Sequence, residues 1–129
     1  MALFYYEKEA LVVPAAPTIT SVQIGVGGGI NSTFALEIHN TGIKALASCV
    51  ISTQYHPKGA WYPALLTGSW VIDAEGGAIG TLAAAGKGVL VLNVAGLYGI
   101  KLDFVAVGNY ITSSEPKDQT VLNVYGTGQ

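Results

Sequence analysis

Apolar and polar residues alternate along much of this chain. In the segment 33–39, Phe34, Leu36 and Ile38 fall at every second position. This spacing is typical of a β-strand with one buried face, because successive side chains of a strand point to opposite sides. No segment shows a convincing helical repeat, and 81–86 is too short to predict a helix. We therefore expect an all-β protein.

Turn residues separate the segments of strand character. Asn-Thr-Gly at 40–42 and Pro-Lys-Gly at 57–59 are typical turn sequences. Their number and spacing predict an antiparallel β-sandwich or small barrel of about eight strands, covering residues 18–129. The expected strands are 18–24, 33–39, 45–56, one beginning at 61–62, 69–73, 88–94, 98–107 and 119–125.

The alternation also predicts which side chains share a face of each strand. In the strand 88–94, Leu90, Leu92 and Val94 alternate with other residues. Two further sets are expected on one face of their strands: Cys49, Ile51, Thr53 and Tyr55 in 45–56, and, pointing inward, Tyr98, Ile100, Leu102, Phe104 and Ala106 in 98–107.

Residues 1–17 are expected to form an extended N-terminal arm. The segments 2–7 and 10–13 are rich in apolar residues, and Pro14 and Pro17 disfavour a helix where they end. Ordering such an arm costs about 1–2 kcal/mol per residue in backbone entropy, so a neighbour or the chain's own domain must hold it. The candidate partner-binding residues of the arm are Leu3, Phe4, Tyr5, Tyr6, Leu11, Val12 and Val13.

The chain carries few charges for a soluble domain. Charged residues make up 11% of it, against about 25% in an average domain. Charge keeps a surface solvated and monomeric. We therefore expect part of the surface to be covered by a partner.

Neither nucleic acid nor a membrane is an expected partner. The six cations are all lysines spread along the sequence, whereas nucleic-acid binders gather basic residues and favour arginine. The nearly uncharged stretch 78–100 contains Lys87 near its middle and several glycines. Two strands joined by a Gly-Lys-Gly turn explain this stretch better than a spanning helix.

No arrangement of residues predicts catalysis, a metal or a cofactor. The glycine cluster at 25–29 lacks the third glycine of a dinucleotide fingerprint and the Gly-Lys-Ser/Thr of a phosphate loop. His39 and His56 would need a third ligand, for which Glu37 is the nearest candidate. Cys49 is the single cysteine, so no internal disulfide can form, and we expect it to be buried. The chain is therefore not expected to be an enzyme.

An aromatic group offers a second type of contact. Trp61, Tyr62 and Trp70 lie close together in the sequence. Exposed on a sandwich, such side chains could stack on sugar rings or on a protein partner, whereas buried they would belong to the core. A carbohydrate-binding module is therefore kept as an alternative function.

Two runs of the chain resemble small bacteriophage structural proteins. The first includes NTG at 40–42, CVI at 49–51 and HPKGAWY at 56–62, and the second includes LAAAG at 82–86 and VLVLNVAGLYGIKL at 89–102. In such proteins an apolar strand leads through a Gly-Leu corner into a second strand, which often carries an arginine. This chain has Lys101 there instead. The resemblance spans roughly residues 33–125.

The resemblance implies an Ig-like or jelly-roll-like sandwich on a virion. Its function would be to decorate or cement a phage capsid through contacts with other capsid or virion proteins, or, as a variant, to form part of the tail or neck. The protein would be made in the bacterial host cytoplasm and end up in the virion, and we expect a homo-oligomer. Low charge and an apolar arm suited to strand addition agree with this expectation.

Overall fold

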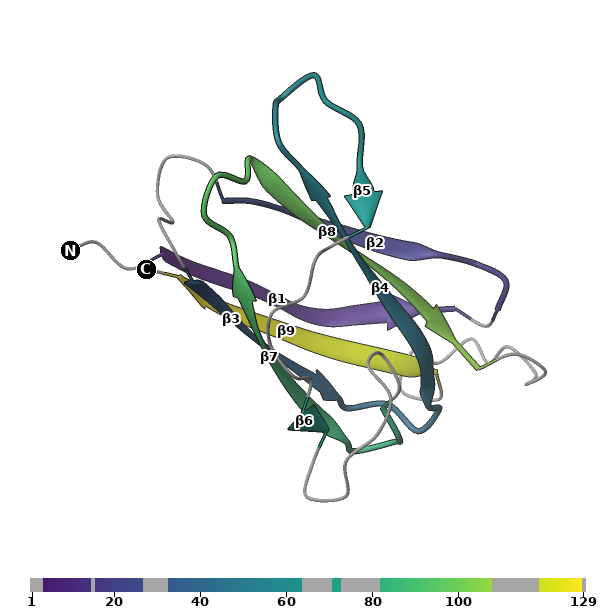
Figure 1. Ribbon diagram of the computed structural model, residues 1–129. Helices are drawn as coiled ribbons and strands as arrows, with labels where there is room; N and C mark the ends of the chain where they lie inside the picture. Colours follow the sequence, from purple (N-terminus) through teal and green to yellow (C-terminus); the bar gives the residue numbers. More distant parts are fainter. Residues whose placement is uncertain are drawn as a thin grey trace.

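A computed structural model describes residues 4–14, 16–26, 33–63, 71–72, 82–107 and 119–128. In these ranges the chain is all-β, as expected, and contains no helix. Two antiparallel sheets face each other in a sandwich-like arrangement (Figure 1). The described part of the chain has no apolar helix of the length needed to span a membrane.

The described chain forms seven strands of six residues or more and two strands of two residues. One sheet has the order β1-β9-β3-β7-β6, and the other has the order β2-β8-β4-β5. The strands are β1 Phe4–Val13, β2 Thr20–Gly25, β3 Thr33–Asn40, β4 Leu46–Gln54, β5 Tyr62–Pro63, β6 Val71–Ile72, β7 Lys87–Asn93, β8 Gly99–Ala106 and β9 Thr120–Gly128.

The strands pair in a nested order. β1 pairs with β9, β2 with β8, β3 with β7, and β4 with β5, always antiparallel. Successive nested pairs alternate between the two sheets, and the pairings β3–β9 and β4–β8 join them within each sheet. The two-residue β6 adds an edge next to β7. The chain therefore behaves as one long antiparallel ribbon folded across two layers.

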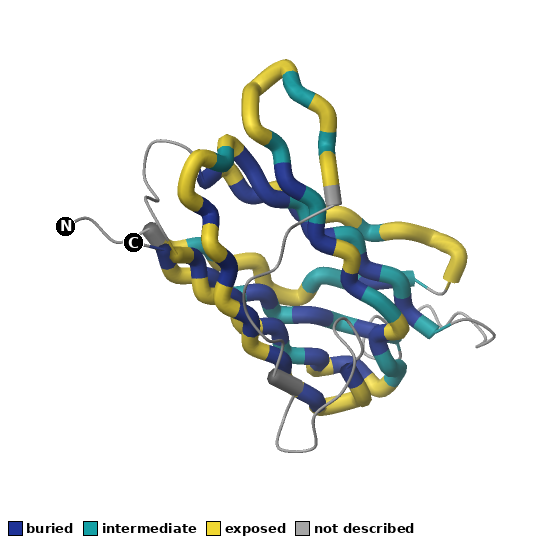
Figure 2. Tube along the Cα trace, in the orientation of Figure 1, coloured by how far each residue is buried: buried dark blue, intermediate teal, exposed yellow. Residues whose placement is uncertain are grey.

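One apolar core lies between the sheets. Figure 2 shows buried and exposed positions alternating along the strands. Phe34, Leu36 and Ile38 of β3 face Ile100, Leu102 and Phe104 of β8 across this core, and all six are fully buried. The predicted inward faces of 33–39 and 88–94 are confirmed, as is the burial of Cys49. The face predicted for 45–56 is confirmed for Cys49, Ile51 and Thr53, and that for 98–107 from Ile100 onward.

Two side chains at strand ends depart from the prediction, which gives Tyr55 the same face as the buried Cys49 and Ile51 and turns Tyr98 inward. Tyr55 follows the last residue of β4 and is 53% exposed, and Tyr98 precedes the first residue of β8 and is 44% exposed. At both positions the strand has ended, so the strict alternation of a pleated strand no longer applies.

The N-terminal segment belongs to the sandwich rather than standing apart from it. Residues Phe4–Val13 form β1, which pairs with β9 over almost its whole length. One extra residue is inserted between Lys8 and Leu11, where Ala10 has a φ of 55° and its N–H donates to Asn123 Oδ1 at 2.9 Å. This bulge changes the alternation along β1 and disguises it in the sequence.

Candidate functional site

The outer face of the five-stranded sheet carries three exposed large apolar side chains among the described residues. Tyr5 on β1 is 69% exposed, and Val89 and Val91 on β7 are 41% and 47% exposed. The register aligns Tyr5 with Thr127, Thr127 with Ala35, and Ala35 with Val91 in one row across the sheet. We call this surface the outer face; its members are Tyr5, Glu7, Ala35, Glu37, Val89, Val91, Tyr125 and Thr127.

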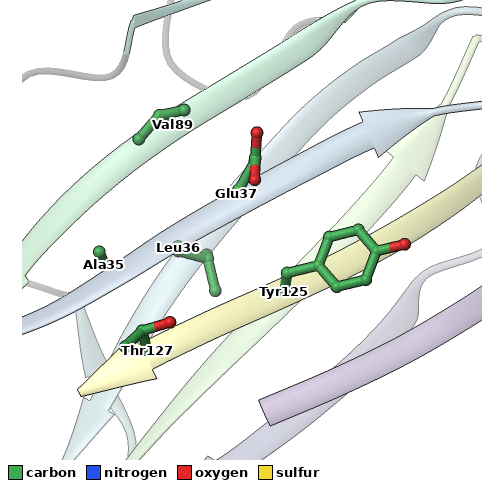
Figure 3. A pocket seen from close by; sticks show the side chains of 6 residues that line it. All are labelled: Ala35, Leu36, Glu37, Val89, Tyr125 and Thr127. Atoms are coloured by element: carbon green, nitrogen blue, oxygen red, sulfur yellow. The ribbon is translucent and has the colours of Figure 1, made fainter. Parts of the chain in front are cut away.

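A second row crosses the outer face next to the first. It runs from Glu7 through Tyr125 and Glu37 to Val89. Side chains of both rows line a shallow hollow of about 250 Å³, in which Glu37 and Tyr125 stand on neighbouring strands with Val89 beyond them (Figure 3). The hollow thus combines an aromatic ring, aliphatic side chains and one carboxylate.

Carboxylates gather at the β1 side of the hollow. The hydroxyl of Tyr125 donates to Glu9 Oε1 at 3.4 Å. A hydrogen bond with Glu9, and then the charge of Glu9, raise the pKa of Glu7 above its ordinary value. The pKa of Tyr125 is raised as well. Partial desolvation is the largest cause, and the negative charge of Glu9 is the next. This edge of the outer face therefore has a local excess of negative charge.

His39 contacts both Tyr125 and Glu37 of the outer face. Its ring stands edge-on to Tyr125, with 5.5 Å between the ring centroids. His39 Nε2 is 3.0 Å from Glu37 Oε1, close enough for an ion pair when the ring is protonated but not aligned for a hydrogen bond. The arrangement holds the Tyr125 ring between two acidic positions.

The outer side of the four-stranded sheet is more polar. Ser21 on β2 donates to the carboxylate of Asp103 on β8, and Lys101 lies 3.9 Å from the same carboxylate. Val50 on β4, 55% exposed, is aligned with Asp103. The exposed Val50 therefore has charged and polar side chains beside it on this sheet face, whereas three exposed large apolar side chains share the outer face of the other sheet.

The structure divides the predicted arm residues between the core and the surface. Val13 is fully buried, and Tyr6 and Leu11 pack against the core. These three side chains already have partners within the chain, because β1 turns them toward the opposite sheet. Tyr5 remains exposed and Val12 is half-buried. Leu3 lies outside the described residues, and for Phe4 only the main chain is described.

Of the three aromatic residues proposed as a contact group, the structure describes Trp61 and Tyr62. Trp61 is half-buried, and the Lys101 ammonium lies 5.1 Å from its ring centroid. Tyr62 is exposed and its ring lies 6.3 Å from that of Tyr55. Trp70 lies outside the described residues.

Trp61 instead shares a second hollow with Tyr98, at one end of the four-stranded sheet. This hollow has a volume of about 260 Å³. Tyr98 was assigned to the core by its spacing, so its participation was missed. The polar lining comes from Gln23, Gln54 and the main chain of Gly25 and Gly99.

The residues considered as possible metal ligands do not converge. Glu37 and His39 are neighbours, but His56 lies in the turn after β4, where its Nδ1 accepts a hydrogen bond from the Lys58 N–H at 3.0 Å. Within the described ranges, no group of three or more His, Cys, Asp or Glu side chains could hold a metal ion.

Burial raises the pKa of the Cys49 thiol to about 12, with a smaller effect from Asp103.

Sequence reasoning did not single out the central residues of the outer face. Val89 and Val91 lie in the run 89–102 quoted for the resemblance, but nothing in that run marks them as contact residues. Like Tyr125, each is an ordinary β-strand residue. The alternation along 119–125 was the signal that could have found Tyr125. It places Tyr125 on the face of the strand that points away from the buried Leu122 and Val124. Only the strand order places these residues on the same sheet face as Tyr5.

Compared with known proteins, the chain matches no family model, no curated protein and no solved structure.

Proposed function

We propose that this chain is a non-enzymatic structural protein of a bacteriophage virion, which decorates or cements the capsid through its outer face. The observation that carries the proposal is that the exposed apolar side chains of Tyr5, Val89 and Val91 share one sheet face. Apolar side chains gathered on one exposed face are typical of a surface that binds another protein. The proposed partner is a capsid subunit, and copies of this chain would be additional neighbours.

The strand order favours the jelly-roll variant of the sandwich over the Ig-like one. When β6 is set aside, eight strands pair first with last and second with second-last. Such an order is that of a jelly roll, a fold used in viral capsid and lectin domains. In an Ig-like sandwich the first two strands share a sheet, whereas here β1 and β2 lie in different sheets. Fold alone does not define function, so this likeness supports the proposal without carrying it.

The chemistry of the outer face describes the partner. Its centre would bury apolar surface, which stabilises contacts at about 25 cal/mol per Å². Glu7 and Glu37 would meet basic residues of the capsid protein, because an unpaired carboxylate at a dry interface is costly. The expected partner surface is thus aliphatic or aromatic at its centre, with lysine or arginine beside it.

β1 is an edge strand of the sheet and not a free arm. As an edge strand, β1 has one side paired to β9 and the other side without a neighbouring strand among the described residues. Strand addition to this edge is a second way in which a neighbouring subunit could attach. Deleting residues 2–13 would therefore damage the fold as well as the binding, and point substitutions on the outer face are the better test.

The test is the protein content of the particle. Phage particles produced from the genome that encodes this chain would be purified by density gradient, and their proteins identified and quantified by mass spectrometry. We expect the chain in many copies per particle, and we expect the purified chain to rebind particles made without it. Its absence from purified particles, or its failure to rebind, would overturn the proposal.

A further inference from the structure

From the hollow at the end of the four-stranded sheet, we infer a binding site for a neutral saccharide, with Trp61 and Tyr98 as stacking platforms. This goes beyond capsid decoration, which needs no such site, and it uses a different sheet from the outer face. The hollow has a volume of about 260 Å³ and is lined by Trp61, Tyr98, Gln23, Gln54 and the main chain of Gly25 and Gly99. Pockets for drug-sized ligands span roughly 300–1,000 Å³, so this one suits a single sugar ring.

The aromatic rings provide the apolar part of the site. Tyr98 is 44% exposed although its main chain is fixed by two hydrogen bonds, from its N–H to Gln54 O at 2.8 Å and from Val26 N–H to its own carbonyl at 2.9 Å. A fixed backbone with an exposed ring is a preorganised surface. The C–H face of a pyranose ring can stack on such a ring, and the tyrosine hydroxyl and indole N–H add polar contacts.

The glutamine amides provide the polar part. Gln54 Nε2 donates to Gly59 O at 2.8 Å, which fixes the orientation of the amide. Its carbonyl oxygen, Oε1, then faces the hollow, only 3.6 Å from the position that a Cβ on Gly99 would occupy. Gln23, exposed on β2, brings a second amide. Amides both donate and accept, as the hydroxyl groups of a sugar require.

The charge around the hollow favours an uncharged ligand. None of the described residues that line it is Asp, Glu, Lys or His. Lys101, whose ammonium lies 5.1 Å from the Trp61 ring centroid, is 3.9 Å from the Asp103 carboxylate. A charged sugar or a charged peptide would therefore gain no ion pair from the lining residues themselves.

Gly99 forms the floor of the site and gives a means of closing it. A Cβ placed there would lie 3.4 Å from Trp61 Cη2, which is ordinary van der Waals contact. The Gly99→Val substitution would fill the space between Trp61 and Gln54. Since valine is favoured in strands, the fold should tolerate it. Tyr98→Ala, at an exposed position outside the strands, is a second variant that removes one platform without touching the core.

The experiment is a heteronuclear NMR titration of the full chain with the methyl glycosides of glucose, galactose, mannose and N-acetylglucosamine. We expect at least one sugar to bind with a Kd of about 1 mM, a typical affinity for so small a ligand, and to shift the Trp61 indole and Gly99 amide signals. Gly99→Val and Tyr98→Ala should each weaken binding about tenfold or more, and Tyr5→Ala, an exposed tyrosine on the other sheet, should not.

Two outcomes would overturn the inference. One is the absence of any shift at the hollow with all four glycosides at high millimolar concentration. The other is a shift that Tyr98→Ala and Gly99→Val, both folded by circular dichroism, leave unchanged. A proline-rich peptide titrated in parallel tests whether the hollow binds polypeptide instead. Peptide binding together with the first outcome would assign the hollow to a polypeptide and contradict the saccharide site. None of these results depends on whether the chain is part of a virion.

Discussion

Gly126 on β9 lies directly beneath the aromatic ring of Phe34 on β3. A Cβ added at Gly126 would overlap the ring, and both residues are fully enclosed in the core. The close approach is possible because Gly126 is aligned with Leu36, the next inward residue of β3. The missing side chain at position 126 is therefore what makes room for Phe34.

Gly126→Ala is expected to destabilise the protein by about 1–3 kcal/mol, because the core would have to move to accept the methyl group. Chemical denaturation monitored by circular dichroism measures this change. Gly25→Ala is the matched control: Gly25 also lies in a strand, but an added Cβ there meets nothing within 4 Å. Equal loss of stability in the two variants would contradict the packing described.

Asn40 should be the most sensitive polar residue of the core. Its side-chain N–H₂ group donates to Lys44 O at 2.8 Å and lies 3.3 Å from Ala83 O, while Oδ1 accepts from Gly42 N–H at 3.1 Å. Asn40→Leu would remove these bonds and leave the buried Gly42 N–H without its acceptor, which costs about 1–3 kcal/mol.

Asn93 supplies the control for Asn40. It also accepts a hydrogen bond from a residue two positions later, the Ala95 N–H at 3.1 Å, but it is exposed. Asn93→Leu is expected to change the free energy of unfolding by no more than about 0.5 kcal/mol. Thermal denaturation measures the Tm of both variants. A larger loss of Tm in Asn93→Leu than in Asn40→Leu would contradict the stabilising role of the Asn40 hydrogen bonds.

Glu7 should make stability depend on pH in an unusual direction for a carboxylate. Its raised pKa means that the folded state holds the proton more tightly than the unfolded state, so the stabilisation is present below the ordinary glutamate pKa and is lost as pH rises through the folded pKa. Glu7→Gln should therefore raise the Tm near pH 7 and have little effect below about pH 4. A Tm that falls at neutral pH would show that the carboxylate is stabilising.

Cys49 is expected to be unreactive while the protein is folded. Burial raises the pKa of its thiol to about 12, so almost no thiolate exists near pH 8, and the sulfur is enclosed. Because the chain has one cysteine, a thiol-specific chromogenic reagent reports on this residue alone. The reaction should be slow in buffer and immediate in denaturant, and rapid reaction of the folded protein would place Cys49 at the surface.

Two exposed valines on opposite sheets allow the binding face to be tested. Val91 on β7 lies on the outer face, and Val50 on β4 lies on the other sheet, with similar exposures of 47% and 55%. Val91→Arg should weaken binding to phage particles about tenfold or more, because it places a charge in the proposed interface. Val50→Arg should leave binding unchanged, and the reverse result would assign the interface to the four-stranded sheet.

The alternating pattern was sufficient to predict most strands after residue 18 and much of the core. Phe34, Leu36 and Ile38 were assigned correctly because alternation is a local property that each strand carries in its own sequence. Tyr55 and Tyr98 were assigned wrongly because each lies one residue outside its strand. Strand ends depend on turns and neighbouring strands, which the alternation does not encode.

The role of the N-terminal segment and the outer face could not be predicted from local sequence. Tyr6 pairs with Gly126 across almost the whole length of the chain, and no local pattern specifies such a partner. The bulge at Ala10 also breaks the alternation that would have shown β1 to be half-buried. The outer face needs four strands from distant parts of the sequence, so it exists only once the strand order is known.

Hydroxyl-radical footprinting of the chain, free and bound to purified phage particles, tests the central claim most directly. Tyr5 on the outer face and Tyr98 on the other sheet are both exposed in the free chain, at 69% and 44%. We predict that oxidation of Tyr5 falls strongly in the particle while oxidation of Tyr98 stays near its free value. Unchanged oxidation of Tyr5, or protection of Tyr98 alone, would contradict the assignment of the outer face as the surface that meets the capsid.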